Sequence, residues 1–169
     1  LPSDHFIVDE NAFRATIERA LAGARAGYLT TIGVVPTRPE TGYGYIEVGE
    51  GEVASGVVPT KRFVEKPDRA RAEEYLASGR FLWNAGMFFF RAGDMLEAIR
   101  AYLPALADGL AAIDRAAAAG GEDDEGKKTF PTLPSISIDH GVMERAGKVA
   151  VVRGDFGWND VGSWQSAWE

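Results

Sequence analysis

The sequence predicts an α/β protein built on a mixed, mainly parallel sheet with helices on both faces. Three observations support this prediction. Strand-like apolar runs alternate with helix-like segments, which is the order typical of an α/β sheet. Several of these runs are apolar throughout, as expected for strands that are covered on both faces. The polar motifs fall where the strand-like runs end, which is where such sheets gather their ligands.

Composition narrows the class of protein. The 169 residues are enough to bury one core, and no repeat or linker divides them. The net charge of −7 argues against a general nucleic-acid surface, which would be basic. The chain has no cysteine and only two histidines, so disulfides, thiolate zinc sites, thiol nucleophiles and a Ser-His-Asp triad are disfavoured. With no run near the roughly 20 apolar residues of a membrane span and no signal peptide, we expect a cytoplasmic protein.

The first half of the chain combines one long helix with several strands. Asp9 is predicted to cap a helix over residues 10–26, where apolar residues recur at helical spacing, and Gly27 is predicted to end it. The run "YLTTIGVVP" at 28–36 is typical of a buried strand. The glycine-rich segment 41–67, with its short alternating runs, predicts two or three strands joined by turns.

The second half alternates helices and strands. Asp68 and Gly79 are the expected cap and stop of a short charged helix. The run "GMFFFRA" is apolar nearly throughout and predicts a strand that is buried on both faces. The remaining expectations, in order, are two helices broken at Pro104 between 93 and 119, a mobile charged loop at 120–128, a turn and short helix at 137–147, a last strand at 148–156, and a last helix from Val161.

The stretch "FVEKP" ends a predicted strand with Glu65 and Lys66 side by side. Adjacent side chains of an extended chain point to opposite faces, so both reach one ligand only if a bulge or twist intervenes. The ordinary interpretation is a solvated Glu-Lys pair. The functional one is a carboxylate that accepts hydrogen bonds from hydroxyl groups, beside an ammonium that meets a phosphate. A sugar phosphate would use both groups.

Two further stretches offer uncharged contacts. Asn84 in "FLWNAGMFFF" either caps a turn or bonds to the hydroxyl groups of a sugar ring, and Gly86 would let a ligand or backbone approach closely. Gly42 and Gly44, which flank Tyr43 in "TGYGYI", indicate either a hairpin turn or a backbone amide that faces a ligand.

Asp4 in "PSDH" and Asp160 in "GWNDVGSW" are candidate metal ligands. Each alone is equally a candidate helix N-cap. As a pair at strand ends in a phosphate site, they suit Mg²⁺, which takes one or two carboxylates and completes its shell with water and phosphate oxygens. A divalent cation would also let an acidic chain bind an anionic substrate.

Six stretches, taken in order, closely resemble those of the mannose-1-phosphate guanylyltransferases, a branch of the sugar nucleotidyltransferases. The similarity runs from residue 1 to 169. It implies a Rossmann-like nucleotidyltransferase fold that transfers a guanylyl group from GTP to mannose 1-phosphate and releases pyrophosphate. The stretches are "PSDH", "TGYGYI", "FVEKP", "FLWNAGMF", "SIDHGVME" and "GWNDVGSW".

The resemblance also implies a role for each candidate residue. Three of them, Asp4, Lys66 and Asp160, would be catalytic. Around Asp160, Gly157 and Gly162 would permit a tight turn, while Trp158 and Trp164 would brace it. The implied contacts are Mg²⁺ at Asp4 and Asp160, mannose hydroxyl groups at Glu65, the sugar phosphate at Lys66, the sugar at Asn84, and a backbone amide at Gly44.

The sequence departs from the family at its start. The family begins with a strand and a "GxGTRxxP"-like loop that grips the nucleotide triphosphate, and these 169 residues contain no such loop. We therefore expect a chain that is incomplete at its N-terminus and inactive alone. Residues 1–169 would be the C-terminal portion of a sugar nucleotidyltransferase domain, with the sugar-phosphate and metal half of the site.

The expected partners are mannose 1-phosphate and GTP, the latter held mainly by the missing part. No nucleic acid or membrane is expected, and a homo-oligomer is left open. Two alternatives remain: specificity for another hexose 1-phosphate, since fold alone does not choose the sugar, and a non-catalytic module that binds a sugar phosphate or a partner chain.

Overall fold

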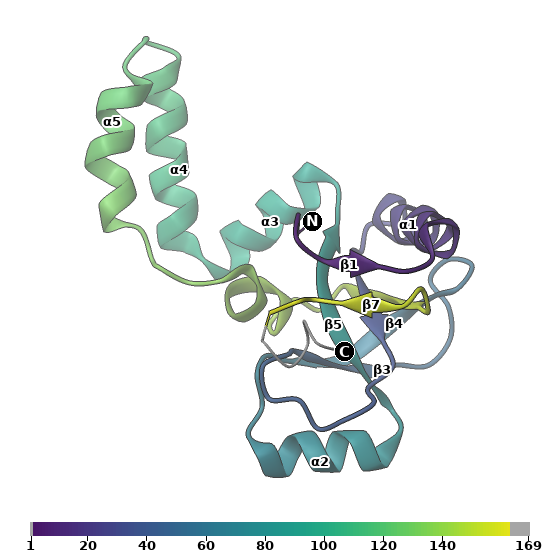
Figure 1. Cartoon of the computed structure of the whole chain (residues 1–169). Coiled ribbons are helices and arrows are strands. Elements are labelled where there is room, and N and C mark those ends of the chain that lie inside the picture. The colour runs from purple at the N-terminus through teal and green to yellow at the C-terminus, as the bar shows by residue number, and fades with distance from the viewer. Residues whose placement is uncertain (1, 163–169) are drawn as a thin grey trace. The chain divides into compact units, whose positions relative to one another are not determined.

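The structure, a computed structural model, describes residues 2–162 and divides the chain into two compact units (Figure 1). The first unit contains the residues up to Arg91 and those from Gly147 onward, and the second is Ala92–Ala146. Every residue predicted to form the site lies in the first unit.

Five strands of the first unit close into a barrel. β2 runs parallel to β6, but the other four neighbouring pairs are antiparallel, so the expectation of a mainly parallel sheet was wrong. Only β3 and β4 are joined by a short connection, which requires that pair to run antiparallel. In the other three antiparallel pairs the strands are far apart in the chain, so their direction follows from which edges pair. The barrel order is β2 (Leu29–Val34), β5 (Phe81–Phe89), β3 (Tyr45–Val48), β4 (Val57–Val64) and β6 (Val149–Gly154).

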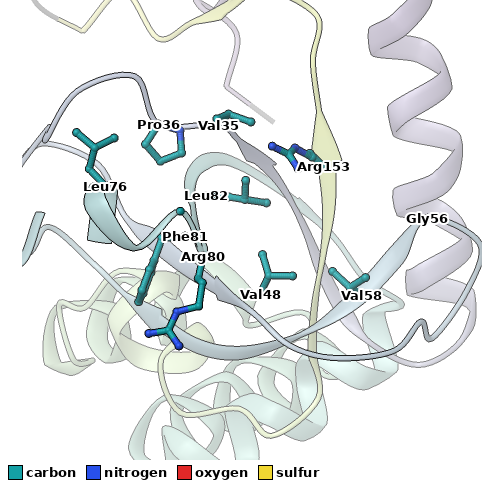
Figure 2. A pocket seen from close by; sticks show the side chains of 11 residues that line it. Val35, Pro36, Val48, Gly56, Val58, Leu76, Arg80, Phe81, Leu82 and Arg153 are labelled. Atoms are coloured by element: carbon teal, nitrogen blue, oxygen red, sulfur yellow. The ribbon is translucent and has the colours of Figure 1, made fainter. Parts of the chain in front are cut away.

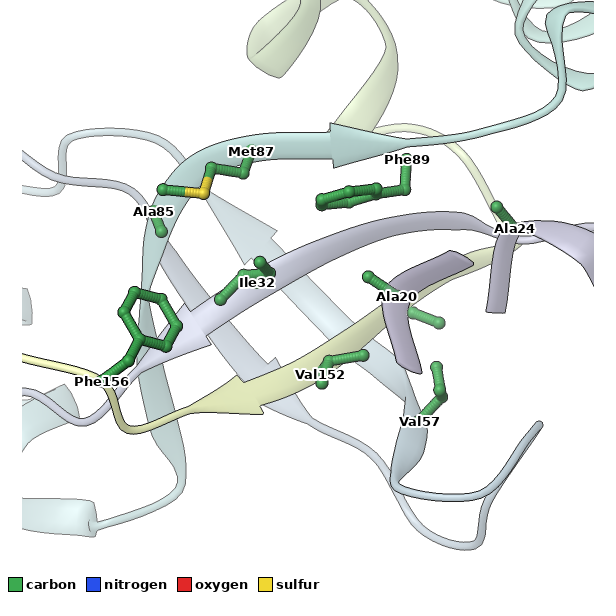
Figure 3. Close-up of a cluster of buried hydrophobic side chains, with 10 residues drawn as sticks. Ala20, Ala24, Ile32, Val57, Ala85, Met87, Phe89, Val152 and Phe156 are labelled. Carbon is green, nitrogen blue, oxygen red and sulfur yellow. The ribbon is translucent and has the colours of Figure 1, made fainter. Parts of the chain in front are cut away.

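Helix α1 (Glu10–Arg25) covers one part of the barrel wall and begins as predicted. The Asp9 carboxylate accepts hydrogen bonds from two backbone N–H groups of the first turn, at 2.9 and 3.0 Å. Gly27 follows the helix in the left-handed conformation, with φ 86°. Small residues let the helix lie close to the strands (Figure 3), in a buried cluster of Ala20, Ala24, Ile32, Val57, Ala85, Met87, Phe89, Ala150, Val152 and Phe156.

Helix α2 (Arg69–Ser78) covers another part of the wall. Asp68 caps it by accepting from the N–H of Arg71, and Gly79 ends it with φ 64°, both as predicted. Its buried face stacks the ring of Tyr75 on that of Phe81 with 4.0 Å between the ring centroids. The expected sheet with helices on both faces is not confirmed, because α1 and α2 each cover part of the wall of a closed barrel. The second cluster comprises Tyr45, Ala72, Tyr75, Phe81 and Trp83.

A two-stranded ladder stands apart from the barrel. β1 (Phe6–Ile7) pairs antiparallel with β7 (Trp158–Asn159). Neither strand was predicted, because two residues show no periodicity, and β6 is therefore not the last strand. The helix expected from Val161 lies mostly outside the described residues, which end at 162.

The second unit is helical. Pro104 separates its first two helices, as predicted, and stands at the first position of the second one. The charged segment 120–128 is not a loop, because its acidic residues fill the first turn of a helix and its lysines the last turn, which complements the helix dipole. The elements are α3 (Ala92–Tyr102), α4 (Pro104–Ala117), α5 (Glu122–Thr129), a 3₁₀ turn η1 (Phe130–Thr132) and a π-helical turn η2 (Asp139–Met143).

Across residues 2–162, every helix is too short or too polar to traverse a lipid bilayer.

The close approach of α1 to the barrel yields a test of the fold. A Cβ at Gly23 would lie 2.6 Å from Oγ1 of Thr30 and 2.9 Å from Cγ1 of Val57. Gly23→Ala should therefore destabilise the protein by about 1–3 kcal/mol through overpacking, although alanine in a helix normally gains about 1 kcal/mol over glycine. Chemical denaturation followed by circular dichroism measures the change.

Gly126→Ala is the matched control, because Gly126 lies in α5 and a Cβ there would meet no atom within 4 Å. It should be neutral or stabilising. A Gly23→Ala protein as stable as the unmodified one would contradict the packing of α1 described above.

Candidate functional site

Three predicted residues lie in a row across three strands. Tyr45 of β3 is paired with Val64 of β4 and with Trp83 of β5. The residues next to these, Gly44, Glu65 and Asn84, are therefore neighbours, and the N–H of Asn84 donates to the carbonyl of Gly44 at 2.8 Å.

The missing side chain of Gly44 leaves a hollow in this row. A Cβ there would lie 2.5 Å from Oε2 of Glu65 and 3.2 Å from Cβ of Asn84. Only a glycine lets the carboxylate and the amide approach so closely, since a side chain would overlap Oε2 of Glu65. We call the place of this missing side chain, between Glu65 and Asn84, the Gly44 hollow. The structure brings together three residues that the sequence had placed in separate motifs.

Hydrogen bonds from neighbouring residues fix the orientation of the Asn84 amide. Its Oδ1 accepts from the N–H of Gly86 at 3.2 Å. The hydroxyl of Thr31 lies 2.9 Å from the same oxygen and 3.0 Å from the carbonyl of Met87, so its single proton is shared between two acceptors. With Oδ1 held there, the donor Nδ2 is the atom on the side of Gly44. Nδ2 can donate to a hydroxyl or phosphate oxygen.

Sequence reasoning missed Thr31 and the backbone conformation that Gly86 supplies. Thr31 is fully buried in β2, and the only signal for it was a pair of threonines inside an otherwise apolar run. A Cβ on Gly86 would have no neighbour closer than 3.8 Å in the described chain, so no close backbone contact requires glycine there. Its φ of 67° instead supplies the backbone conformation at an irregularity in the pairing of β2 with β5.

A left-handed residue brings Glu65 and Lys66 to the same side. Lys66 has φ 46°, and its Nζ lies 3.4 Å from Oε1 of Glu65. The sequence had required a bulge or twist here, and this turn of the backbone provides it. The Glu65 side chain is 11% exposed and that of Lys66 is 62% exposed. Because the lysine end of this pair is exposed, the pair contributes less than about 1 kcal/mol. The ammonium is therefore accessible to an anion such as a phosphate.

Asp160 is held by a tyrosine from a distant segment. The Tyr43 hydroxyl donates to its Oδ1 at 2.6 Å, and the N–H of Gly162 donates to the same oxygen at 3.1 Å. Burial first, and then this bond to Asp160, raise the pKa of Tyr43 well above its usual value, so the phenol keeps its proton. Sequence reasoning had treated Tyr43 only as the residue between two glycines.

The β1–β7 ladder brings Asp4 toward Asp160. Phe6 pairs with Asn159, and continuing that register by one residue sets His5 opposite Asp160. Burial lowers the pKa of His5, while the charges of Asp4 and Asp160 both act to raise it, so the two carboxylates lie near the same ring. The structure therefore brings both candidate metal ligands near His5, and Asp4 does not cap the helix that follows it, because Asp9 does.

A hydrogen bond from Trp158 fixes the tautomer of the neutral His5 ring. Its indole N–H donates to Nδ1 of His5 at 3.0 Å, and the two rings meet edge to face at 5.4 Å. Nδ1 is therefore an acceptor, and in the neutral ring the proton is on Nε2. Trp158 also packs against both buried clusters and against the ring of Tyr43, which bonds to Asp160. Trp164, the other expected brace, lies outside the described residues.

Asp4 and Asp160 supply the type of donor atom that Mg²⁺ takes. Both candidates supply carboxylate oxygens, Asp4 from an exposed and Asp160 from a half-buried position. Residues 2–162 contain no group of three or more His, Cys, Asp or Glu placed to hold a metal. Mg²⁺ is commonly bound in this manner, with one or two carboxylates, water and phosphate oxygens.

Backbone strain marks both halves of the site. Lys66 and Val161 are the only non-glycine residues with positive φ in the described chain, at 46° and 52°. Each directly follows a predicted ligand carboxylate, Glu65 or Asp160. For a β-branched residue such as Val161 this conformation is a genuine outlier. Such outliers cost about 1–3 kcal/mol each and concentrate at functional sites.

The turn at Asp160 uses its glycines differently. Gly157 has φ 64°, the backbone freedom that was predicted. Gly162 is outside the left-handed region, and its role is steric, because a Cβ there would lie 2.6 Å from Oδ2 of Asp160. The N–H of Val161 donates to Oδ1 of Asn159 at 2.8 Å, which closes the turn.

Two cavities of the first unit differ in their relation to this site. One of about 390 Å³ opens at the end of the barrel and is apolar apart from Arg80 and Arg153 (Figure 2). It includes none of the predicted residues. The other, of about 320 Å³, is lined by Tyr43 and Trp158 among others, and it reaches the residue next to Asp160. The second cavity therefore adjoins the candidate site.

Comparison with known proteins agrees with this geometry. Residues 1–169 match the family model described as nucleotidyl transferase. The xanthan biosynthesis protein XanB of Xanthomonas campestris pv. campestris (strain B100) is 51% identical over 170 residues, covering 98% of this chain and 35% of the relative. The mannose-1-phosphate guanylyltransferase of Escherichia coli (strain K12) is 46% identical over 178 residues, covering 100% of this chain and 36% of the relative.

Solved structures share the fold. A Thermus thermophilus protein described as a mannose-1-phosphate geranyltransferase superposes with a TM-score of 0.85 at 41% identity, over 98% of this chain and 47% of its own. A Helicobacter pylori protein described as a mannose-6-phosphate isomerase gives 0.79 at 30% identity, over 95% and 62%. The chain spans about a third of the length of the curated relatives named above.

The α/β fold, the match over the whole chain and these relatives lead to one conclusion: the chain belongs to the nucleotidyl transferase family.

Proposed function

We propose that the protein transfers a guanylyl group from GTP to mannose 1-phosphate, giving GDP-mannose and pyrophosphate. The Gly44 hollow carries this proposal, because Gly44 lets a carboxylate and an amide come close together beside the Lys66 ammonium. Hydroxyl groups and a phosphate, the two parts of a sugar phosphate, match these groups. The choice of mannose and GTP is supported by the name of the Escherichia coli relative.

Each residue then has a distinct task. Glu65 accepts hydrogen bonds from sugar hydroxyl groups, and Asn84 donates through the Nδ2 that its buried contacts orient. Lys66 exchanges its partly exposed pair with Glu65 for the sugar phosphate. These contacts position the sugar phosphate, which is the main requirement of phosphoryl transfer.

The reaction forms a bond between a sugar-phosphate oxygen and the α-phosphorus of GTP, and it breaks the bond to the β-phosphate. The attacking oxygen is already anionic, so no residue has to act as a general base. Mg²⁺, when bound by Asp4 and Asp160, would neutralise charge on the phosphate oxygens. Lys66 adds a second positive charge beside the attacking group.

Turnover tests the substrates directly. The protein expressed from its full gene should release pyrophosphate from GTP and mannose 1-phosphate. The release should be much slower when glucose 1-phosphate replaces mannose 1-phosphate, or when ATP replaces GTP. A coupled pyrophosphate assay measures the rates. A preference for glucose 1-phosphate would overturn the proposed sugar, and no release from any pair would favour a module that only binds a sugar phosphate.

Removal of Lys66 tests the phosphate contact. Lys66→Ala should raise the KM for mannose 1-phosphate about 10- to 100-fold, the range of a lost hydrogen bond to a charged group, and leave the KM for GTP nearly unchanged. Lys61→Ala is the control, because it removes the same charge from β4, where the buried Glu47 keeps Arg62 as a partner. Equal losses for both substrates would show that Lys66 does not read the sugar phosphate.

Filling the Gly44 hollow tests the sugar contact. Gly44→Ala places a methyl group against Glu65 and Asn84, so we expect a KM for mannose 1-phosphate at least about 10-fold higher, with an unchanged KM for GTP. Gly42→Ala serves as control, since its Cβ would meet only Oε1 of Glu40, at 3.4 Å. Isothermal titration with mannose 1-phosphate checks the binding. Unaltered affinity in Gly44→Ala would place the sugar elsewhere.

A further inference from the structure

The bond between Tyr43 and Asp160 joins two segments that are 117 residues apart. At 2.6 Å it has the length of a charge-assisted O–H···O⁻ hydrogen bond. The Tyr43 ring cannot easily turn away, because it meets Trp83 and Trp158 edge to face, with centroids 5.2 and 5.4 Å apart. The hydroxyl is therefore presented from a fixed ring.

The two oxygens of the Asp160 carboxylate are not equivalent. Oδ1 accepts from the hydroxyl of Tyr43 and from the N–H of Gly162. Oδ2 accepts no hydrogen bond from the described part of the chain. The space beside Oδ2 exists because residue 162 is glycine, and a Cβ there would lie only 2.6 Å away.

We propose that Tyr43 is a positioning residue of the metal site, which occupies Oδ1 of Asp160 so that Oδ2 is presented to the cation. The proposal rests on the proposed function, in which Asp160 is a metal ligand. A carboxylate on a turn can rotate about two side-chain bonds, and fixing one oxygen removes that freedom before the cation arrives. Contacts of this kind to a metal ligand change metal affinity about 10- to 100-fold.

The position of Tyr43 also links the two halves of the site. Tyr43 directly precedes Gly44, whose hollow lies between Glu65 and Asn84. One dipeptide thus sets both the metal-facing carboxylate and the space for the sugar. A displacement of this segment would affect the cation and the sugar together.

Metal binding, measured separately from turnover, tests this role. Tyr43→Phe removes the hydroxyl and keeps the ring against both tryptophans. In the complete protein we expect it to weaken binding of Mn²⁺ alone about 10-fold, as measured by electron paramagnetic resonance of the unbound ion, with an unchanged melting temperature. Turnover should require about 10-fold more Mg²⁺ for half its maximum and recover at saturating Mg²⁺.

Tyr45→Phe is the matched control. Tyr45 lies two residues further along the same segment, is fully buried, and its hydroxyl finds no hydrogen-bond partner of ordinary geometry in residues 2–162. It should bind Mn²⁺ as the unmodified protein does. If Tyr45→Phe weakened Mn²⁺ binding as much as Tyr43→Phe does, the loss would come from altered packing of the segment and not from the Tyr43 hydroxyl. That result would overturn the proposal.

Asp160→Asn separates this inference from the proposed function. Normal Mn²⁺ affinity in Asp160→Asn would overturn the metal site itself. Loss of Mn²⁺ in Asp160→Asn with normal affinity in Tyr43→Phe would overturn only the role of Tyr43. If Tyr43→Phe lowers the melting temperature, Gly162→Ala tests the same arrangement at Oδ2. It should weaken Mn²⁺ at least as much, and normal affinity there would overturn the assignment of Oδ2.

Discussion

The register of β3 between β4 and β5 is the constraint on which both halves of the candidate site depend. Tyr45 is paired on both sides, which holds Gly44 between a carboxylate and an amide and sets Tyr43 against Asp160. A slip of one residue would exchange the faces of successive side chains, so a tyrosine would fill the hollow. Tyr45 and Ile46, both fully buried, oppose such a slip, because it would move each to the other face. The core therefore determines the geometry of the site.

Two residues with strained backbone conformations lie in the candidate site. Lys66 and Val161 adopt positive φ directly after Glu65 and Asp160, at a cost that the packed barrel must offset. At Lys66 the strain brings two adjacent charges to one side of the chain, which no regular strand can do. Asp4 and Asp160 are the two candidate carboxylates near His5, so the proposed cation would take its other ligands from water and the substrate.

The sequence by itself determined the features whose causes are local. Asp9 and Asp68 cap helices because a short side chain bonds to N–H groups two or three residues away. Pro104 separates two helices because proline lacks the N–H that a helix interior needs. The motifs also identified the family from the sequence alone, because a motif is a local run of residues. The helix at 122–129 was missed because its run of charges was read as a solvated loop, whereas their order along the chain favours a helix.

Only the tertiary structure decided how distant segments meet. Strand direction depends on which edges pair, and an apolar run reads the same for parallel and antiparallel neighbours, so the barrel could not be foreseen. The contact of Thr31 with Asn84 spans 53 residues and that of Tyr43 with Asp160 spans 117, well beyond any periodicity in the sequence. A motif supplies the type of side chain at a position. Its partner is set by long-range packing, because contacts between remote residues form only when the whole core closes.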